Sequence, residues 1–163
     1  MPRRELLAIY LRDHRAGAAA GIRAAQRLRD HGGPTLRPPM TALAREIAED
    51  RDGLDNVMSD LGVTPSRVKA ALAAAGSQLG RLKLNGRLVR RSPLSDVLEL
   101  EALGAGVTAK RDLWLALTVV EPAIPELDGD QLARLEQRAA DQLARIGELH
   151  SAAAGALSST TDR

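Results

Sequence analysis

The sequence contains no cysteine and no phenylalanine, and its 163 residues include a single tyrosine and a single tryptophan. Without cysteine, the chain cannot form a disulfide scaffold, a cysteine-type zinc site, an iron–sulfur cluster or a thiol nucleophile. β-Sandwiches and barrels draw on aromatic and β-branched residues, whereas the alanine, leucine, arginine and glutamate used here are typical helix formers. The composition therefore predicts an all-α protein.

No charge of one sign prevails, because 23 Lys and Arg residues balance 21 Asp and Glu residues to a net charge of +2. Such a balance gives no indication of nucleic-acid or membrane binding through net charge. No stretch approaches the roughly 20 apolar residues of a membrane span. Arg12, Asp13 and Arg15 interrupt the apolar run that an N-terminal signal peptide would need. We therefore expect a cytoplasmic protein.

Apolar residues recur at helical spacing over four long segments. The predicted helices span about residues 2–29, 39–61, 92–120 and 129–157. Gly62 is a predicted C-terminal cap, and Asp128 with Gln131 resembles a capping box. The third segment is apolar on much of its circumference, which predicts that it is well buried.

A long middle connection separates the two pairs of helices. Within it, Thr64-Pro65 predicts the start of a short fifth helix, and Asn85-Gly86 predicts a hairpin-like turn. Short loops join the first two and the last two helices, so each pair is antiparallel. The predicted fold is a ferritin-like four-helix bundle: two antiparallel hairpins joined by a long crossover. It forms one domain over residues 1–157, followed by a disordered tail over residues 158–163.

Three stretches resemble a family of uncharacterised bacterial helical proteins. The stretches are Tyr10-Leu11-Arg12-Asp13-His14 with Ala16-Gly17, Gly80-Arg81-Leu82-Lys83-Leu84-Asn85-Gly86-Arg87-Leu88, and Ser92-Pro93-Leu94-Ser95 through Glu99-Leu100-Glu101. The resemblance covers most of the chain and implies a ferritin-like bundle without an assigned activity. Ferritin-like proteins often carry a di-iron site, built from one Glu on each of two helices and Glu-x-x-His on the other two. This sequence departs from that signature, with His14 in place of a mid-helix glutamate and Glu46-x-x-Glu49 in place of Glu-x-x-His.

Four polar residues interrupt otherwise apolar stripes. They are His14, Glu46, Asp50 and Glu101. His14 and Asp50 both fall near the middle of antiparallel neighbouring helices, so they are expected to form a buried hydrogen-bonded pair. The alternatives are that they make no contact, or that the four residues bind a divalent metal such as iron or manganese.

Glycines also occur inside two predicted helices, where each costs roughly 1 kcal/mol relative to alanine. They are Gly17, Gly21, Gly104 and Gly106. We expect them to let neighbouring helices approach closely, and the alternative is a space left for an apolar ligand.

The connector carries a basic cluster without an interspersed acid. Its members are Arg81, Lys83, Arg87, Arg90 and Arg91. Such a cluster can hold phosphate or nucleic acid, although the lack of aromatic platforms disfavours single-strand binding. The alternative is that these side chains pair with acidic helix surfaces or are solvated, which the balanced charge of the chain favours.

No catalytic or cofactor motif stands out, so we expect a non-catalytic protein without a cofactor. The predicted function is protein–protein interaction or self-association as a homodimer. Trp114, or exposed apolar positions on the first and last helices, would supply the interface. A divergent ferritin-like metal protein and a phosphate or nucleic-acid binder are the alternatives.

Overall fold

The computed structural model describes residues 3–65 and 93–158, and within these ranges the chain is helical apart from short connections. Its long helices are α1 (Arg3–His31), α2 (Arg37–Asp60), α4 (Pro93–Val120) and α5 (Gly129–Ser158), and a short 3₁₀ helix, η1 (Glu121–Ala123), follows α4. These ranges contain no strand. The prediction of an all-α chain with four long helices is confirmed here. The short fifth helix, the Asn85-Gly86 turn and residues 159–163 lie outside the described residues.

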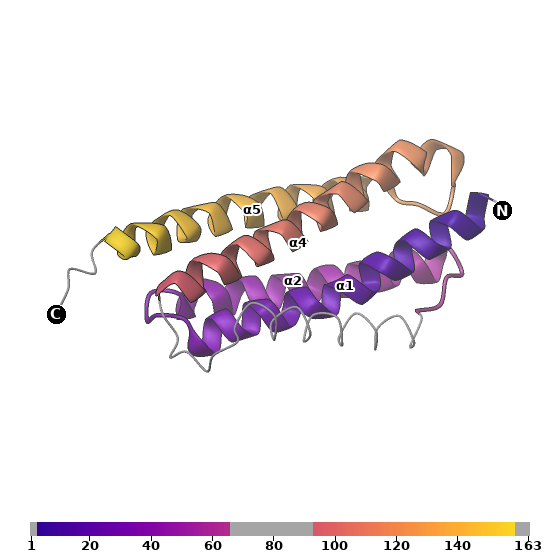
Figure 1. The fold of residues 1–163 in the computed structure, drawn as a ribbon. Coiled ribbons are helices and arrows are strands. Elements are labelled where there is room, and N and C mark those ends of the chain that lie inside the picture. Colours follow the sequence, from indigo (N-terminus) through magenta and orange to yellow (C-terminus); the bar gives the residue numbers. More distant parts are fainter. Residues whose placement is uncertain (1–2, 66–92, 159–163) are drawn as a thin grey trace.

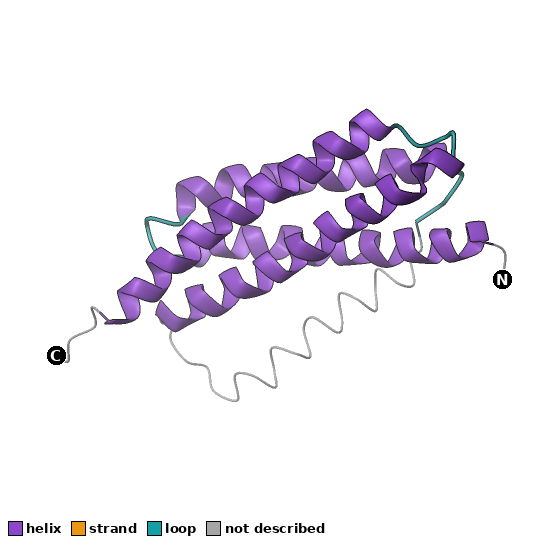
Figure 2. Ribbon diagram, turned by 90° about the horizontal axis from the view of Figure 1, so that it is seen from above, coloured by secondary structure: helices purple, strands orange, loops and turns teal. Residues whose placement is uncertain are grey.

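The four helices lie side by side in a bundle, and the two ribbon views show the same arrangement (Figures 1 and 2). α1 packs antiparallel to α2, and α4 packs antiparallel to α5. α1 also packs against α4, whereas α2 and α5 approach one another less closely than the helices of either hairpin do. This wider seam between α2 and α5 is where polar side chains gather.

The helix ends follow the signals in the sequence. Gly62 has a positive φ of 68°, the left-handed conformation that glycine adopts without a Cβ clash. The Gly62 amide donates to the Ser59 carbonyl (2.9 Å) and the Val63 amide to the Met58 carbonyl (2.7 Å), which together form a Schellman cap. At the start of α5, the Asp128 carboxylate accepts a hydrogen bond from the Gln131 amide at 3.1 Å. The predicted Gly62 cap is confirmed, and so is the Asp128 half of the predicted capping box.

The core lies along the bundle axis and draws on all four helices. Its largest fully buried apolar side chains are Leu11, Leu28, Met40, Leu43, Met58, Leu100, Leu103, Leu113, Trp114, Leu117 and Leu132. Trp114 is completely buried, so the expectation that it supplies a dimer interface is wrong. Its indole Nε1 is buried without a hydrogen-bond partner in the part of the chain that the structure describes.

α4 is apolar on two opposite faces, and only one of them is in the core. Buried residues such as Leu100, Leu103 and Val107 lie on the inner face. The outer face carries large exposed residues, whose exposed fractions are 50% for Leu94, 53% for Leu98, 44% for Leu115 and 80% for Val119. The expectation that α4 is well buried is therefore wrong for this face. The error arose because a helix with two apolar faces has the same composition as a buried helix.

The glycines expected to bring helices together are not required for close packing. A Cβ placed on Gly21 or Gly104 would meet its nearest side chain at 3.8 Å or 3.6 Å, which is ordinary contact, and one placed on Gly17 or Gly106 would meet nothing within 4 Å. A tight contact between two helices does occur at Gly53 in α2, where a Cβ would lie 3.1 Å from Leu135 Cδ2 of α5.

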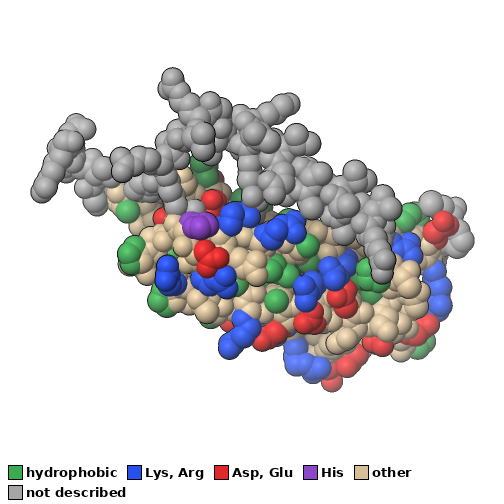
Figure 3. All heavy atoms as spheres, turned by 90° about the horizontal axis from the view of Figure 1, so that it is seen from below, with side chains coloured by type: hydrophobic (Ala, Val, Ile, Leu, Met, Phe, Trp, Pro, Cys, Tyr) green, Lys and Arg blue, Asp and Glu red, His purple; other side chains and the backbone are tan. Residues whose placement is uncertain are grey.

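Charged side chains of both signs are interspersed over the face shown in Figure 3, with hydrophobic side chains between them. This mixture follows from the balanced composition. None of the described helices combines the length and the apolar content that a bilayer crossing needs.

Candidate functional site

The middle of the bundle holds a buried polar cluster. Asp50 of α2 is 1% exposed and Gln142 of α5 is fully buried. Lys110 of α4 extends between them: its ammonium group donates to Asp50 Oδ2 and to Gln142 Oε1. The Gln142 amide Nε2 in turn donates to Asp50 Oδ2 at 3.0 Å. These three residues and Arg138 are called the central polar cluster below.

Arg138 of α5 brings a second cation to the same carboxylate. Its Nη2 lies 2.5 Å from Asp50 Oδ1, within ion-pair distance. This contact does not have the geometry of a hydrogen bond, and Oδ1 has no hydrogen-bond partner within residues 3–65 and 93–158. The Nη1 of the same guanidinium lies 3.4 Å from Glu49 Oε2. Asp50 is therefore shared by an ammonium and a guanidinium.

A second ion pair adjoins the cluster on the seam between α2 and α5. The Arg145 guanidinium donates to Glu46 through its two terminal nitrogens: Nη1 to Oε1 at 3.0 Å, and Nη2 to Oε2. Gln142 Nε2 also lies 3.4 Å from Glu46 Oε2 and so connects the two sets of charges. The hydrogen bonds from Arg145 lower the pKa of Glu46 below its ordinary value.

The electrostatics of the seam are nearly compensated. Three carboxylates, Asp50, Glu46 and Glu49, are paired with Lys110, Arg138 and Arg145. Burial lowers the pKa of Lys110, and the adjacent Asp50 carboxylate opposes this shift. A buried charge is tolerated when such partners replace its water. The charged side chains of the seam are thus paired with one another.

The structure does not bring the four predicted site residues together. Glu46 and Asp50 both contact Gln142, whereas Glu101 of α4 lies 3.1 Å from His150 Nε2 of α5 at an exposed position. Over the described ranges, no three His, Asp or Glu side chains form a group that could hold a metal ion.

The expected pair of His14 and Asp50 is not formed among the described residues. The His14 ring instead packs edge-on against Tyr10, with ring centroids 4.6 Å apart, and burial lowers the pKa of its imidazole. Asp50 instead contacts Lys110 of α4 and both Gln142 and Arg138 of α5. The physical reason is that α1 packs against α2 and α4, while the wider seam of α2 opens toward α5.

Sequence reasoning missed Lys110, Arg138 and Gln142. Gln142 falls on the stripe of Leu132, Leu135, Ala139 and Ile146 that defines the buried face of α5. Lys110 occupies the corresponding place on α4, three residues from Val107 and from Leu113, both buried. A lysine and a glutamine on buried stripes were therefore the available signals.

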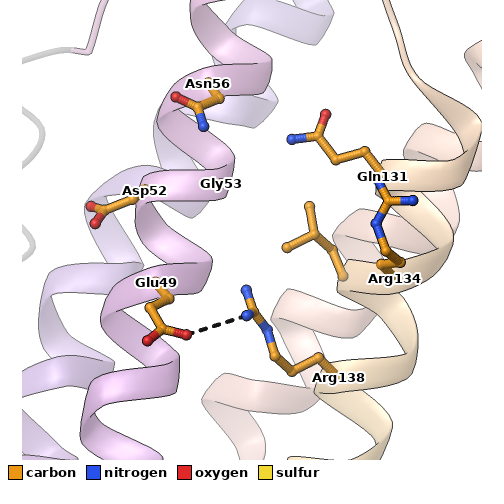
Figure 4. Close-up of a pocket in the computed structure, with 8 residues that line it drawn as sticks. Glu49, Asp52, Gly53, Asn56, Gln131, Arg134 and Arg138 are labelled. Atoms are coloured by element: carbon orange, nitrogen blue, oxygen red, sulfur yellow. Dashed lines mark hydrogen bonds and ion pairs between the residues drawn. The ribbon is translucent and has the colours of Figure 1, made fainter.

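A shallow groove of about 590 Å³ lies beside the cluster, between α2 and α5. Figure 4 shows the Arg138 guanidinium pointing at Glu49, whereas Asp52 points away from α5. The side chains of Asn56, Gln131 and Arg134 also line the groove, and Figure 4 shows them near one end of it. The groove offers polar groups of both signs but no nucleophile next to a base.

The basic cluster of Arg81, Lys83, Arg87, Arg90 and Arg91 lies outside the described residues, so its phosphate or nucleic-acid role stays a prediction. We found no matching family model, curated protein or solved structure for this chain. The resemblance to an uncharacterised bacterial family also stays a prediction.

Proposed function

We propose that this protein is a non-catalytic helical bundle that acts by binding another protein surface, either a partner or a second copy of itself. The observation that carries the proposal is the outer face of α4, which exposes Leu94, Leu98, Leu115 and Val119. Exposed apolar residues that gather on one face are typical of interaction surfaces, whereas scattered ones are ordinary.

The central polar cluster supports the non-catalytic part of the proposal. Asp50 accepts from Lys110 and Gln142 and lies against Arg138. Catalytic acids and bases need a partner in the substrate, within hydrogen-bond reach. Here the charged groups are committed to one another, which is how buried ion pairs hold helices in one arrangement.

We also propose that the frame is ferritin-like, with a crossover between its two hairpins. α2 ends and α4 begins at opposite ends of the bundle (Figure 1). The Gly33 amide, in the loop after α1, donates to Asp96 Oδ2 in the first turn of α4 at 3.4 Å, so the first turn of α4 lies beside that loop. An end of α2 and a start of α4 at opposite ends of the bundle are what a bundle with one long crossover has.

Light scattering of the full chain over a range of concentrations, combined with affinity capture from a lysate, tests the function. We expect self-association or a specific captured protein, and loss of either in the Leu98→Ser/Leu115→Ser variant. Leu157→Ser is the matched control, because Leu157 is 41% exposed on α5. A chain that stays monomeric at every concentration and captures no protein would overturn the proposal.

A further inference from the structure

The outer face of α4 follows a regular pattern along the whole helix. Its exposed positions alternate at spacings of four and three residues, the heptad spacing of helices that pair lengthwise. They are Leu94, Leu98, Glu101, Ala105, Thr108, Asp112, Leu115 and Val119. We call these eight residues the α4 stripe. All eight are exposed, and they lie opposite the residues of α4 that enter the core.

Ordinary surface helices present charged and polar residues opposite their buried face. The exposed positions of α2 follow this rule, as Arg45, Glu49 and Asp52 show. On the α4 stripe only Glu101 and Asp112 carry charge, and both ends of the stripe are apolar. The composition of the α4 stripe is therefore typical of a contact surface between two helices and not of a surface that faces water.

The order of residue types along the stripe is the same in both directions: two apolar residues, an acid, two small residues, an acid and two apolar residues. We therefore propose that the stripe pairs antiparallel with the α4 stripe of a second copy of this chain. This inference rests on the proposed function. A two-fold axis between Gly106 and Val107 places Leu98 of one copy opposite Leu115 of the other. The same axis places Leu94 opposite Val119. Such an interface is self-complementary, as two-fold symmetry requires.

The middle of the stripe fits a close crossing at this axis. Ala105 and Thr108 are the stripe residues nearest the axis, and Ala102 and Ala109 flank them; all four are exposed and none is large. Small residues let two helix backbones approach and bring the leucines at either end into contact. The small residues support the pairing only together with the apolar ends, because they would serve any close neighbour equally well.

The helix dipoles favour the antiparallel direction over the parallel one, because antiparallel helices place opposite ends of their dipoles together. The acids do not separate the two directions. A parallel pair sets Glu101 against Glu101 and Asp112 against Asp112, and an antiparallel pair sets Glu101 against Asp112 twice. These two acid–acid contacts keep the pair weak.

The absence of native cysteine allows a direct test by cross-linking. The full-length Leu98→Cys/Leu115→Cys variant, and a mixture of the two single variants, should form covalent dimers with a short bis-maleimide. Each single variant alone should not, because two copies of position 98 lie about 25 Å apart along the paired helices at 1.5 Å per residue. Circular dichroism of each variant controls for folding.

The outcomes distinguish a failure of the antiparallel pairing from a failure of the proposed function. Dimers from either single variant alone would show parallel pairing and overturn the inference while leaving the proposed function standing. A monomer that captures a different protein would do the same. A monomer that captures nothing overturns both.

A charge change gives a second, independent readout. Asp112→Lys would turn both acid–acid contacts of an antiparallel dimer into ion pairs, and we expect the dimer to bind roughly ten-fold tighter. Glu148→Lys is the control, since it makes the same change of charge at an exposed position of α5. Unchanged or weaker association of the Asp112→Lys variant, with the control unchanged, would overturn the antiparallel register.

Discussion

The seam between α2 and α5 and the outer face of α4 differ in which side chains they bury and which they expose. In the seam, charges lie inside the bundle and are matched, as with Asp50, Lys110 and Arg138. On α4, leucines lie outside and are unmatched, as with Leu94 and Leu98. A buried charge satisfied within the chain needs no partner from elsewhere, whereas an apolar face in water gains free energy from any surface that covers it. This difference is the reason why we propose the interaction surface on α4 and a structural role for the seam.

The largest expected effect comes from breaking the seam. Lys110→Met removes the ammonium that Asp50 Oδ2 accepts from, and we expect unfolding free energy to fall by about 3–5 kcal/mol, the usual cost of one unmatched buried charge. Urea denaturation followed by circular dichroism measures it. The Asp50→Asn/Lys110→Met double variant removes both charges and should recover part of the loss. A single variant as stable as the parent would contradict the structural role of the cluster.

Two leucines of α4, two residues apart, compare the inner and outer faces directly. Leu100 is fully buried and Leu98 is 53% exposed. We expect Leu100→Ala to lower the unfolding free energy by about 2–5 kcal/mol and Leu98→Ala to change it by less than about 0.5 kcal/mol at a concentration where the chain is monomeric. Equal losses from the two variants would show that the outer face is covered within the chain.

Acid should weaken the seam through Glu46. Because Arg145 lowers the folded pKa of Glu46, its contribution is present above the ordinary glutamate pKa and is lost as the pH falls through the lowered folded value. Glu46→Gln should cost about 1 kcal/mol at neutral pH, since the pair is partly exposed, and should flatten the acid side of the stability profile. Denaturation curves at a series of pH values test this, and an unchanged profile would argue against the pair.

The smallest effect separates stability from association. Gly106→Ala and Gly17→Ala both place a methyl group in open space within a helix, and each should raise the stability of the monomer by up to about 1 kcal/mol. Neither variant should change self-association, because Gly106, one residue after Ala105, lies about 100° around α4 from the stripe. Weaker association of the Gly106→Ala variant in sedimentation equilibrium would place the crossing off the stripe.

The sequence predicted the helices well because their ends carry local signals, such as Gly62 and the Asp128 cap. It predicted Asp50 as a buried polar residue but paired it with His14. Spacing along one helix shows which face a residue occupies, but not which of the other helices that face meets. The contribution of Lys110 from α4 depends on how the two hairpins pack together, and that packing has no local signal.

Sedimentation equilibrium of the parent chain beside the Leu98→Ser/Leu115→Ser variant tests the role of α4 most directly. The account predicts that the parent associates with rising concentration, whereas the variant remains a folded monomer with the same helix content. A variant that associates as strongly as the parent would contradict it, because the outer face of α4 would then have no part in the interaction.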